Sequence, residues 1–123
     1  MKKIKNALIS VSDKKNLYLL LKNLVKYKIQ VIGSGGTFKE IKKLGFKCLE
    51  VSKYTDFPEI LDGRVKTLHP KIHAGILSKR NNNSHLKDLK KNNFEEIDLV
   101  VVNFYPFEKT LKSTNNHNKI IEN

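Results

Sequence analysis

The sequence has a single cysteine, Cys48, no tryptophan, and only two arginines, Arg64 and Arg80, among its 24 basic residues. One cysteine excludes an intramolecular disulfide framework and is typical of a reducing compartment. Long hydrophobic runs are also missing, because the only apolar stretch near the basic amino terminus, ALIS, is four residues long. The sequence therefore predicts neither a signal peptide nor a membrane span, and we expect a cytoplasmic protein with no membrane partner.

The formal net charge is +12. The scarcity of arginine affects which ligands this positive charge can be expected to bind. Basic surfaces attract the phosphates of nucleic acids. Bidentate contacts to phosphates and bases, however, favour arginine over lysine. We therefore expect most of the lysines to form a solvated surface, and RNA binding is the least favoured function for this chain.

Apolar runs alternate with helical patterns along the 123 residues, a length typical of one domain. We expect strands at residues 7–9, 29–32, 47–51 and 99–102. Helices are expected at about residues 14–27, in a short segment that Gly45 ends, at 70–77 and around 85–92. The last strand, LVVV, is continuously apolar, which favours a strand covered on both faces. This order predicts an α/β domain with a doubly wound, mainly parallel sheet.

Polar sequence follows three of the predicted strands, as SVSDK from Ser10, GSGGT from Gly33 and NFYP from Asn103. Ligands of open α/β sheets bind beyond the carboxyl ends of the strands, so we expect these segments to face one crevice. The glycine segment is suited to an anion, because backbone N–H groups can converge there beside the hydroxyls of Ser34 and Thr37. The alternative is a glycine turn that only joins a strand to a helix.

The segment DGRVKTLHPKIHAG, residues 62–75, concentrates titratable side chains. Arg64 and Lys66 alternate with Val65, so in an extended loop both would point toward one polar ligand; the alternative is ordinary solvated charge. His69 and His73 are four residues apart and would share a helix face, as zinc ligands do. With no third ligand evident we predict no metal site, and His69 is better explained as a helix cap or as a hydrogen-bonded structural residue.

Taken together, these segments resemble the inosine monophosphate (IMP) cyclohydrolase domain, the amino-terminal part of a bifunctional purine-biosynthesis protein. The matching segments occur in the family's order and are ALISVSDK, GSGGT, EVSKYTDFPEILDGRVKTLHPKIHAGIL and IDLVVVNFYPF. The resemblance implies a three-layer, methylglyoxal-synthase-like α/β domain over residues 1–112, followed by a polar tail at 113–123. It also implies a homodimer that needs no cofactor.

The reaction implied by the resemblance closes the last purine ring, converting 5-formamidoimidazole-4-carboxamide ribotide to IMP with loss of water. A carboxamide nitrogen is a poor nucleophile, so this reaction needs close positioning, a route for protons and donors for the developing oxyanion. The resemblance assigns catalysis to Lys66 and Tyr105. It assigns binding of the substrate's phosphate to Ser10, Ser12, Lys14, Ser34, Gly36 and Thr37. Around the base of the substrate it places Arg64, Thr67 and Asn103 together with the two catalytic residues.

The sequence departs from the family pattern mainly at its end. It stops before the family's Ile-Asp-Ile-Gly-Gly segment, a second catalytic lysine and the formyltransferase part. Losing one member of a cooperating catalytic set costs orders of magnitude in rate. Two functions therefore stay open: an IMP cyclohydrolase whose activity the truncation lowers or abolishes, and a non-catalytic, purine-monophosphate-binding remnant or regulatory module of the same fold.

Overall fold

The computed structural model describes residues 3–103, so Tyr105 and the polar tail at 113–123 lie outside the described residues. Four strands form one sheet in the order β3-β2-β1-β4, and all neighbouring strands pair in parallel. The strands are β1 (Asn6–Ser10), β2 (Gln30–Gly33), β3 (Leu49–Glu50) and β4 (Leu99–Val102). The helices are α1 (Leu17–Lys26), α2 (Gly35–Lys43), α3 (Val51–Thr55), α4 (Pro70–Leu77) and α5 (Asn83–Lys91). The predicted α/β class and parallel sheet are confirmed.

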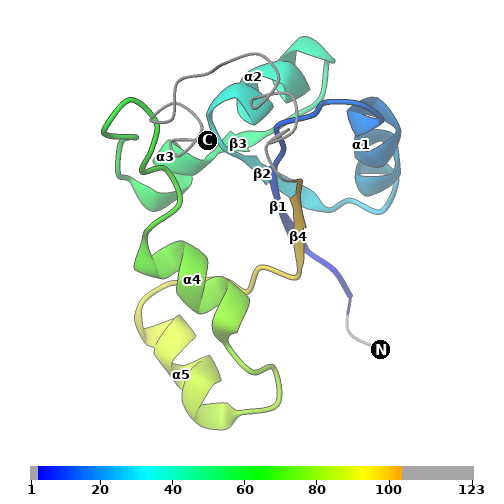
Figure 1. Ribbon diagram of the computed structural model, residues 1–123. Coiled ribbons are helices and arrows are strands. Elements are labelled where there is room, and N and C mark those ends of the chain that lie inside the picture. Colours follow the sequence, from blue (N-terminus) through cyan, green and yellow to red (C-terminus); the bar gives the residue numbers. More distant parts are fainter. Residues whose placement is uncertain (1–2, 104–123) are drawn as a thin grey trace.

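Helices cover both faces of the sheet, with α1 on one side and α4 on the other (Figure 1). Successive side chains of a strand point to opposite faces. In β1, Ala7 and Ile9 therefore join a core with α1 and α2, whereas Leu8 joins a second core with α3 and α4. Two separate cores on the two faces of one sheet make the three layers that were predicted.

The first helix begins later than the predicted residue 14, because the segment after β1 forms a loop. Asn16, the residue before α1, has a left-handed backbone with φ of 64°, and no side chain of residues 3–103 caps the helix there. The Lys15 N–H donates to Asp13 Oδ1 over 2.9 Å. Asp13 therefore stabilises the loop instead of capping α1.

Two helix boundaries follow the predicted signals. Gly45 has a φ of +92°, and its N–H donates to the Lys42 carbonyl over 3.0 Å, which ends α2. His69 is the N-cap of α4: its Nδ1 accepts the Lys71 N–H over 3.0 Å, with Pro70 in the first helical turn. The cap predicted at His69 is confirmed.

The structure corrects the prediction at the two outer strands. Strand β3 is only Leu49–Glu50, because helix α3, which the sequence analysis did not predict, begins directly at Val51. Strand β4 was expected to be covered on both faces, and within the described residues this is wrong. Val100 is 40% exposed and Val102 61% exposed, while Leu99 and Val101 pack against the core beside α1. The physical reason is that β4 is the sheet's edge strand beyond β1, and the described helices cover only one of its faces.

In residues 3–103, no helix is both long enough and apolar enough to cross a membrane.

Candidate functional site

A cavity of about 310 Å³ lies where β1 and β2 end. We call it the carboxyl-end cavity. Its walls come from segments far apart in the sequence, brought together because parallel strands end at one edge of the sheet. It is lined by Ser10, Val11, Ser12, Lys14, Ser34, Gly36, Thr37, Lys66 and Asn103. The convergence of the three strand ends that the sequence predicted is therefore present in the structure.

Buried hydroxyl groups join the walls of this cavity. Ser10 Oγ and Ser34 Oγ are 2.8 Å apart and hydrogen-bonded, which ties the end of β1 to the residue after β2. Thr37 Oγ1 accepts the Val11 N–H over 3.0 Å and also lies 3.3 Å from the Val11 carbonyl oxygen, to which it donates. Ser34 and Thr37 are each only 3% exposed. These contacts fix the spacing between β1 and the start of α2.

Asn103, directly after β4, holds the loop that follows β1. Its Oδ1 accepts the N–H of Ser12 over 2.6 Å and that of Asp13 over 3.2 Å. Its Nδ2 donates to the Asp13 carbonyl over 2.9 Å. The amide group is thus engaged on both sides by the backbone, and Asn103 shapes the cavity by fixing this loop.

Lys14 and the start of α2 supply the positive character of the cavity. The Lys14 ammonium donates to the Val11 carbonyl and, over 3.5 Å, to the Ser12 carbonyl, which holds it at the wall. Within the described residues no side chain caps the start of α2, and a Cβ added to Gly36 would meet nothing within 4 Å. The first N–H groups of a helix attract anions when no cap occupies them. This end of the cavity suits a phosphate group.

Lys66 is among the residues that line the cavity, whereas Arg64 is not. Asp62 and Gly63 have φ of 56° and 81°, and the Arg64 N–H donates to the Leu61 carbonyl over 3.1 Å. Positive φ at both central residues defines a type I′ turn, which reverses the chain here. Arg64 Nη1 donates to the Leu61 carbonyl over 3.3 Å and lies 3.8 Å from Asp62 Oδ2.

The remaining predicted residues of this segment lie away from the cavity lining. Thr67 is half-buried, and its carbonyl accepts the His69 N–H over 2.9 Å. His73 is exposed on α4. No group of three His, Cys, Asp or Glu side chains that could hold a metal ion occurs within residues 3–103. Of the residues expected around the base, the structure thus brings Lys66 and Asn103 to the cavity.

In the part of the chain that the structure describes, two titratable side chains have raised pKa values, and neither lines the cavity. Burial raises the pKa of the Cys48 thiol to about 11. Burial, with a smaller contribution from the Glu95 carboxylate, raises the pKa of Tyr54, whose hydroxyl is buried without a hydrogen-bond partner in the described structure. Both groups stay protonated at neutral pH.

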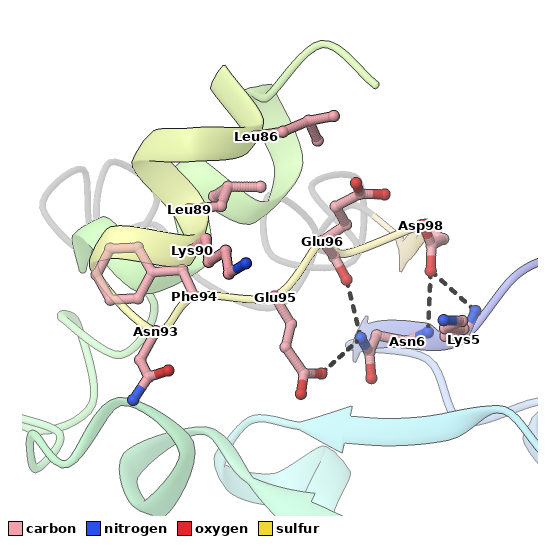
Figure 2. Close-up of a pocket in the computed structure, with 10 residues that line it drawn as sticks. All are labelled: Lys5, Asn6, Leu86, Leu89, Lys90, Asn93, Phe94, Glu95, Glu96 and Asp98. Carbon is pink, nitrogen blue, oxygen red and sulfur yellow. Dashed lines mark hydrogen bonds between the residues drawn. The ribbon is translucent and has the colours of Figure 1, made fainter. Parts of the chain in front are cut away.

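A second cavity of about 550 Å³ lies at the opposite end of β1, beside α5 (Figure 2). We call it the amino-end cavity. Its polar groups bond to one another: Asn6 Nδ2 donates to Glu95 Oε2 over 3.0 Å and to the Glu96 carbonyl over 2.9 Å. Asp98 Oδ2 accepts the N–H groups of Lys5 and Asn6 over 2.8 and 3.2 Å. These contacts join β1 to the segment before β4.

Arg80 completes this junction. Its Nε lies 3.2 Å from Glu96 Oε2 and its Nη2 lies 3.7 Å from Asp98 Oδ1. It also donates to the Ile97 carbonyl over 2.7 Å and to the Gly75 carbonyl over 3.1 Å. The acids of the amino-end cavity are therefore held by partners within the chain, which identifies them as structural.

Similarity to known proteins identifies the family of this chain. Residues 16–123 match the model of the MGS-like domain. The chain belongs to the MGS-like domain family. Among solved structures, this MGS-like chain is similar to the protein in the "Crystal structure of ForH", with a TM-score of 0.75, 32% sequence identity, and coverage of 82% of this chain and 51% of that one.

Curated relatives of this MGS-like chain carry the name bifunctional purine biosynthesis protein PurH. The protein from Acetivibrio thermocellus is 49% identical over 112 residues, covering 91% of this chain and 22% of the relative. That from Clostridioides difficile is 50% identical over 119 residues, covering 97% of this chain and 23% of the relative. The chain thus spans less than a quarter of the length of these two relatives and matches their amino-terminal part.

Proposed function

We propose that this chain binds a purine ribonucleotide in the carboxyl-end cavity and acts as an IMP cyclohydrolase. The observation that carries the proposal is the convergence of hydroxyls, two lysines and the start of α2 on one cavity; no side chain in residues 3–103 caps this helix start. The identity of about 50% to proteins named for purine biosynthesis supports it. The cytoplasmic location and the homodimer expected from the sequence stay predictions.

The phosphate of the nucleotide would bind at the start of α2. The helix terminus offers N–H donors and a partial positive charge, and Lys14 brings a full one. Ser12 and Gly36 line the same wall and allow close approach, since Gly36 has no side chain to block it. This arrangement would leave the heterocyclic ring directed toward Lys66.

In the ring closure, the carboxamide nitrogen forms a bond to the formyl carbon, and the formyl oxygen takes up the negative charge. The carboxamide nitrogen then loses one of its two protons. The formamido nitrogen loses its single proton as the new C=N double bond forms, and the former formyl oxygen leaves as water with these two hydrogens. Lys66 is the described residue suited to stabilise the oxyanion, because it lines the cavity and its side chain ends in a positively charged donor. Tyr105 keeps its predicted catalytic role and lies outside the described residues.

A second candidate function is a binding module that holds purine monophosphates without converting them. One observation favours it: Arg64 and Thr67, expected around the base, are not among the residues that line the cavity. In residues 3–103 the groups suited to a phosphate therefore outnumber those suited to the ring. Such a module would use the same wall of Ser12, Lys14 and Gly36.

One pair of measurements tests both functions. The purified chain is incubated with 5-formamidoimidazole-4-carboxamide ribotide while IMP is quantified by chromatography, and IMP binding is measured by calorimetry. We expect IMP formation above that of the Lys66→Met variant. Binding without turnover would select the module, and the loss of both binding and turnover would overturn both proposals.

A further inference from the structure

The loop that follows β1, residues 11–13, lies between β1 and α1 and belongs to neither element. Side chains bind all six of its backbone N–H and carbonyl groups, and they are those of Lys14, Thr37 and Asn103. Two of the three come from other strand ends, because Thr37 lies in α2 after β2 and Asn103 directly follows β4. The shape of this loop therefore depends on side-chain contacts with distant segments.

The loop uses most of the hydrogen-bonding capacity of Asn103. Its Oδ1 accepts the N–H groups of Ser12 and Asp13 over 2.6 and 3.2 Å, and its Nδ2 donates to the Asp13 carbonyl over 2.9 Å. A side-chain amide oxygen has two lone pairs and its nitrogen has two N–H donors, so one N–H remains for a ligand. The family resemblance places Asn103 around the base, where its amide could therefore donate no more than one hydrogen bond.

The loop also sets the position of two groups suited to the phosphate. Ser12 and Lys14 line the carboxyl-end cavity together with Gly36, at the start of α2. The Lys14 ammonium has three donors, and it donates to two carbonyls of the loop, those of Val11 and Ser12. A loop released by Asn103 would carry Ser12 and Lys14 away from the start of α2.

We propose that Asn103 is a positioning residue for the phosphate and not a contact of the base. Its amide holds the loop after β1 so that Ser12 and Lys14 face the start of α2. The inference rests on the phosphate-bearing ligand of the proposed function but not on turnover. A loop that is ordered before the ligand arrives binds more tightly, because less conformational entropy is lost on binding. Removal of the amide should therefore weaken binding of a sugar phosphate with or without a base.

The binding test compares Asn103→Ala with Asn92→Ala in the full chain. Asn92 also donates its amide to the backbone, at the Asp88 carbonyl over 2.8 Å, but it lies at the end of α5 and lines neither cavity. Dissociation constants are measured by NMR titration for IMP and for ribose 5-phosphate, which has no base. We expect Asn103→Ala to raise both constants about tenfold, and Asn92→Ala to leave both within about twofold of the wild type.

The same titrations can overturn the proposal. A raised constant for IMP alone would make Asn103 a contact of the base. Unchanged constants for both compounds, or a wild type that does not bind ribose 5-phosphate, would also contradict the positioning role. A wild type that binds ribose 5-phosphate, loses this affinity in Asn103→Ala and forms no IMP would remove the cyclohydrolase function and support the positioning role.

Amide hydrogen exchange tests the hold on the loop without a ligand. The N–H groups of Ser12 and Asp13 should exchange at least about tenfold faster in Asn103→Ala than in the wild type, because their acceptor is gone. Both should keep the wild-type rate in Asn92→Ala. Unchanged exchange in the N–H groups of β1 would show that Asn103→Ala is folded. Wild-type exchange of Ser12 and Asp13 in Asn103→Ala would contradict the positioning role even if the chain forms IMP.

Discussion

The two ends of the sheet carry two cavities with opposite chemistry. The amino-end cavity is the larger, at about 550 Å³ against about 310 Å³. Its carboxylates are held by Asn6, Arg80 and backbone N–H groups of β1 and the residue before it. In the carboxyl-end cavity, hydrogen bonds of serine and threonine hydroxyls join the segments that form the walls. The start of α2 has no side-chain cap within the described residues. Cavity size therefore does not identify the site, whereas donors directed at a shared space do.

The difference also separates two uses of charge. At the amino end, charged groups of both signs lie close together and join α4, β1 and the segment before β4. At the carboxyl end, Lys14 and Lys66 line a cavity that has no acid among its described lining residues. Substitutions at the amino end should therefore change stability, and those at the carboxyl end should change binding or turnover.

The largest effect is expected when the cavity lysine is removed. Lys66→Met should lower kcat by about 10²–10³-fold, the loss typical of one donor to a developing oxyanion. The matched control is Lys90→Met, because Lys90 lines the amino-end cavity. Steady-state kinetics of IMP formation should show a change only in the first variant. Equal losses of kcat in both variants would contradict the assignment of catalysis to the carboxyl-end cavity.

Removing the arginine at the amino end should have the next largest effect. Arg80→Met leaves Asp98, whose side chain is 10% exposed, and Glu96 without their arginine contacts. We expect the free energy of unfolding to fall by about 2–4 kcal/mol, measured by urea denaturation. The affinity for IMP, measured well below the unfolding transition, should be unchanged. A loss of affinity for IMP with no loss of stability would indicate that IMP binds at the amino-end cavity, which would contradict the proposal.

A smaller effect should show whether the turn beside Lys66 tolerates a side chain. Gly63→Ala and Gly45→Ala both force alanine into a positive φ, +81° and +92°, at a cost of about 1 kcal/mol each. At Gly45 the new Cβ meets nothing within 4 Å, and at Gly63 it lies 3.4 Å from Glu59 Oε2 and 3.6 Å from Lys66 Nζ, which are ordinary van der Waals distances. Thermal unfolding should therefore show similar losses, and kcat should stay close to the wild-type value in both variants. A fall of kcat in Gly63→Ala alone would contradict the expectation that Lys66 keeps its place in this variant.

The smallest effect concerns Cys48, which lines neither cavity. Burial raises the pKa of its thiol from 9.0 to about 11, so folding favours the protonated form. This contribution is fully present below pH 9 and is lost as the pH rises toward 11. Alkylation by iodoacetamide at pH 8 should be about a hundredfold slower than that of a free cysteine, because the thiolate reacts. Saturating IMP should leave this rate unchanged; protection by IMP would place Cys48 in the site.

The convergence of segments in the carboxyl-end cavity could be predicted from the sequence, because it depends on two local rules. Apolar runs located the strands, and the polar residues that follow parallel strands meet at one edge. The residues that the family resemblance assigned to the phosphate belong to these segments and line the carboxyl-end cavity: Ser10, Ser12, Lys14, Ser34, Gly36 and Thr37. Their roles in binding stay predictions.

The loop carrying Arg64 was harder to predict, because its direction depends on a turn. Asp62-Gly63 is the sequence signal of a type I′ turn. An extended loop was expected here instead, and in such a loop Arg64 would lie beside Lys66. The exposure of Val100 and Val102 likewise depends on strand order, which an apolar run alone does not reveal.

The account depends most on where the nucleotide binds, and backbone amide shifts during titration of the ¹⁵N-labelled chain with IMP test this directly. We expect saturable shifts at Ser12 and Gly36, in the carboxyl-end cavity, and none at Asn6 and Phe94, in the amino-end cavity. Saturable shifts confined to the amino end, or no shifts at all, would contradict the account.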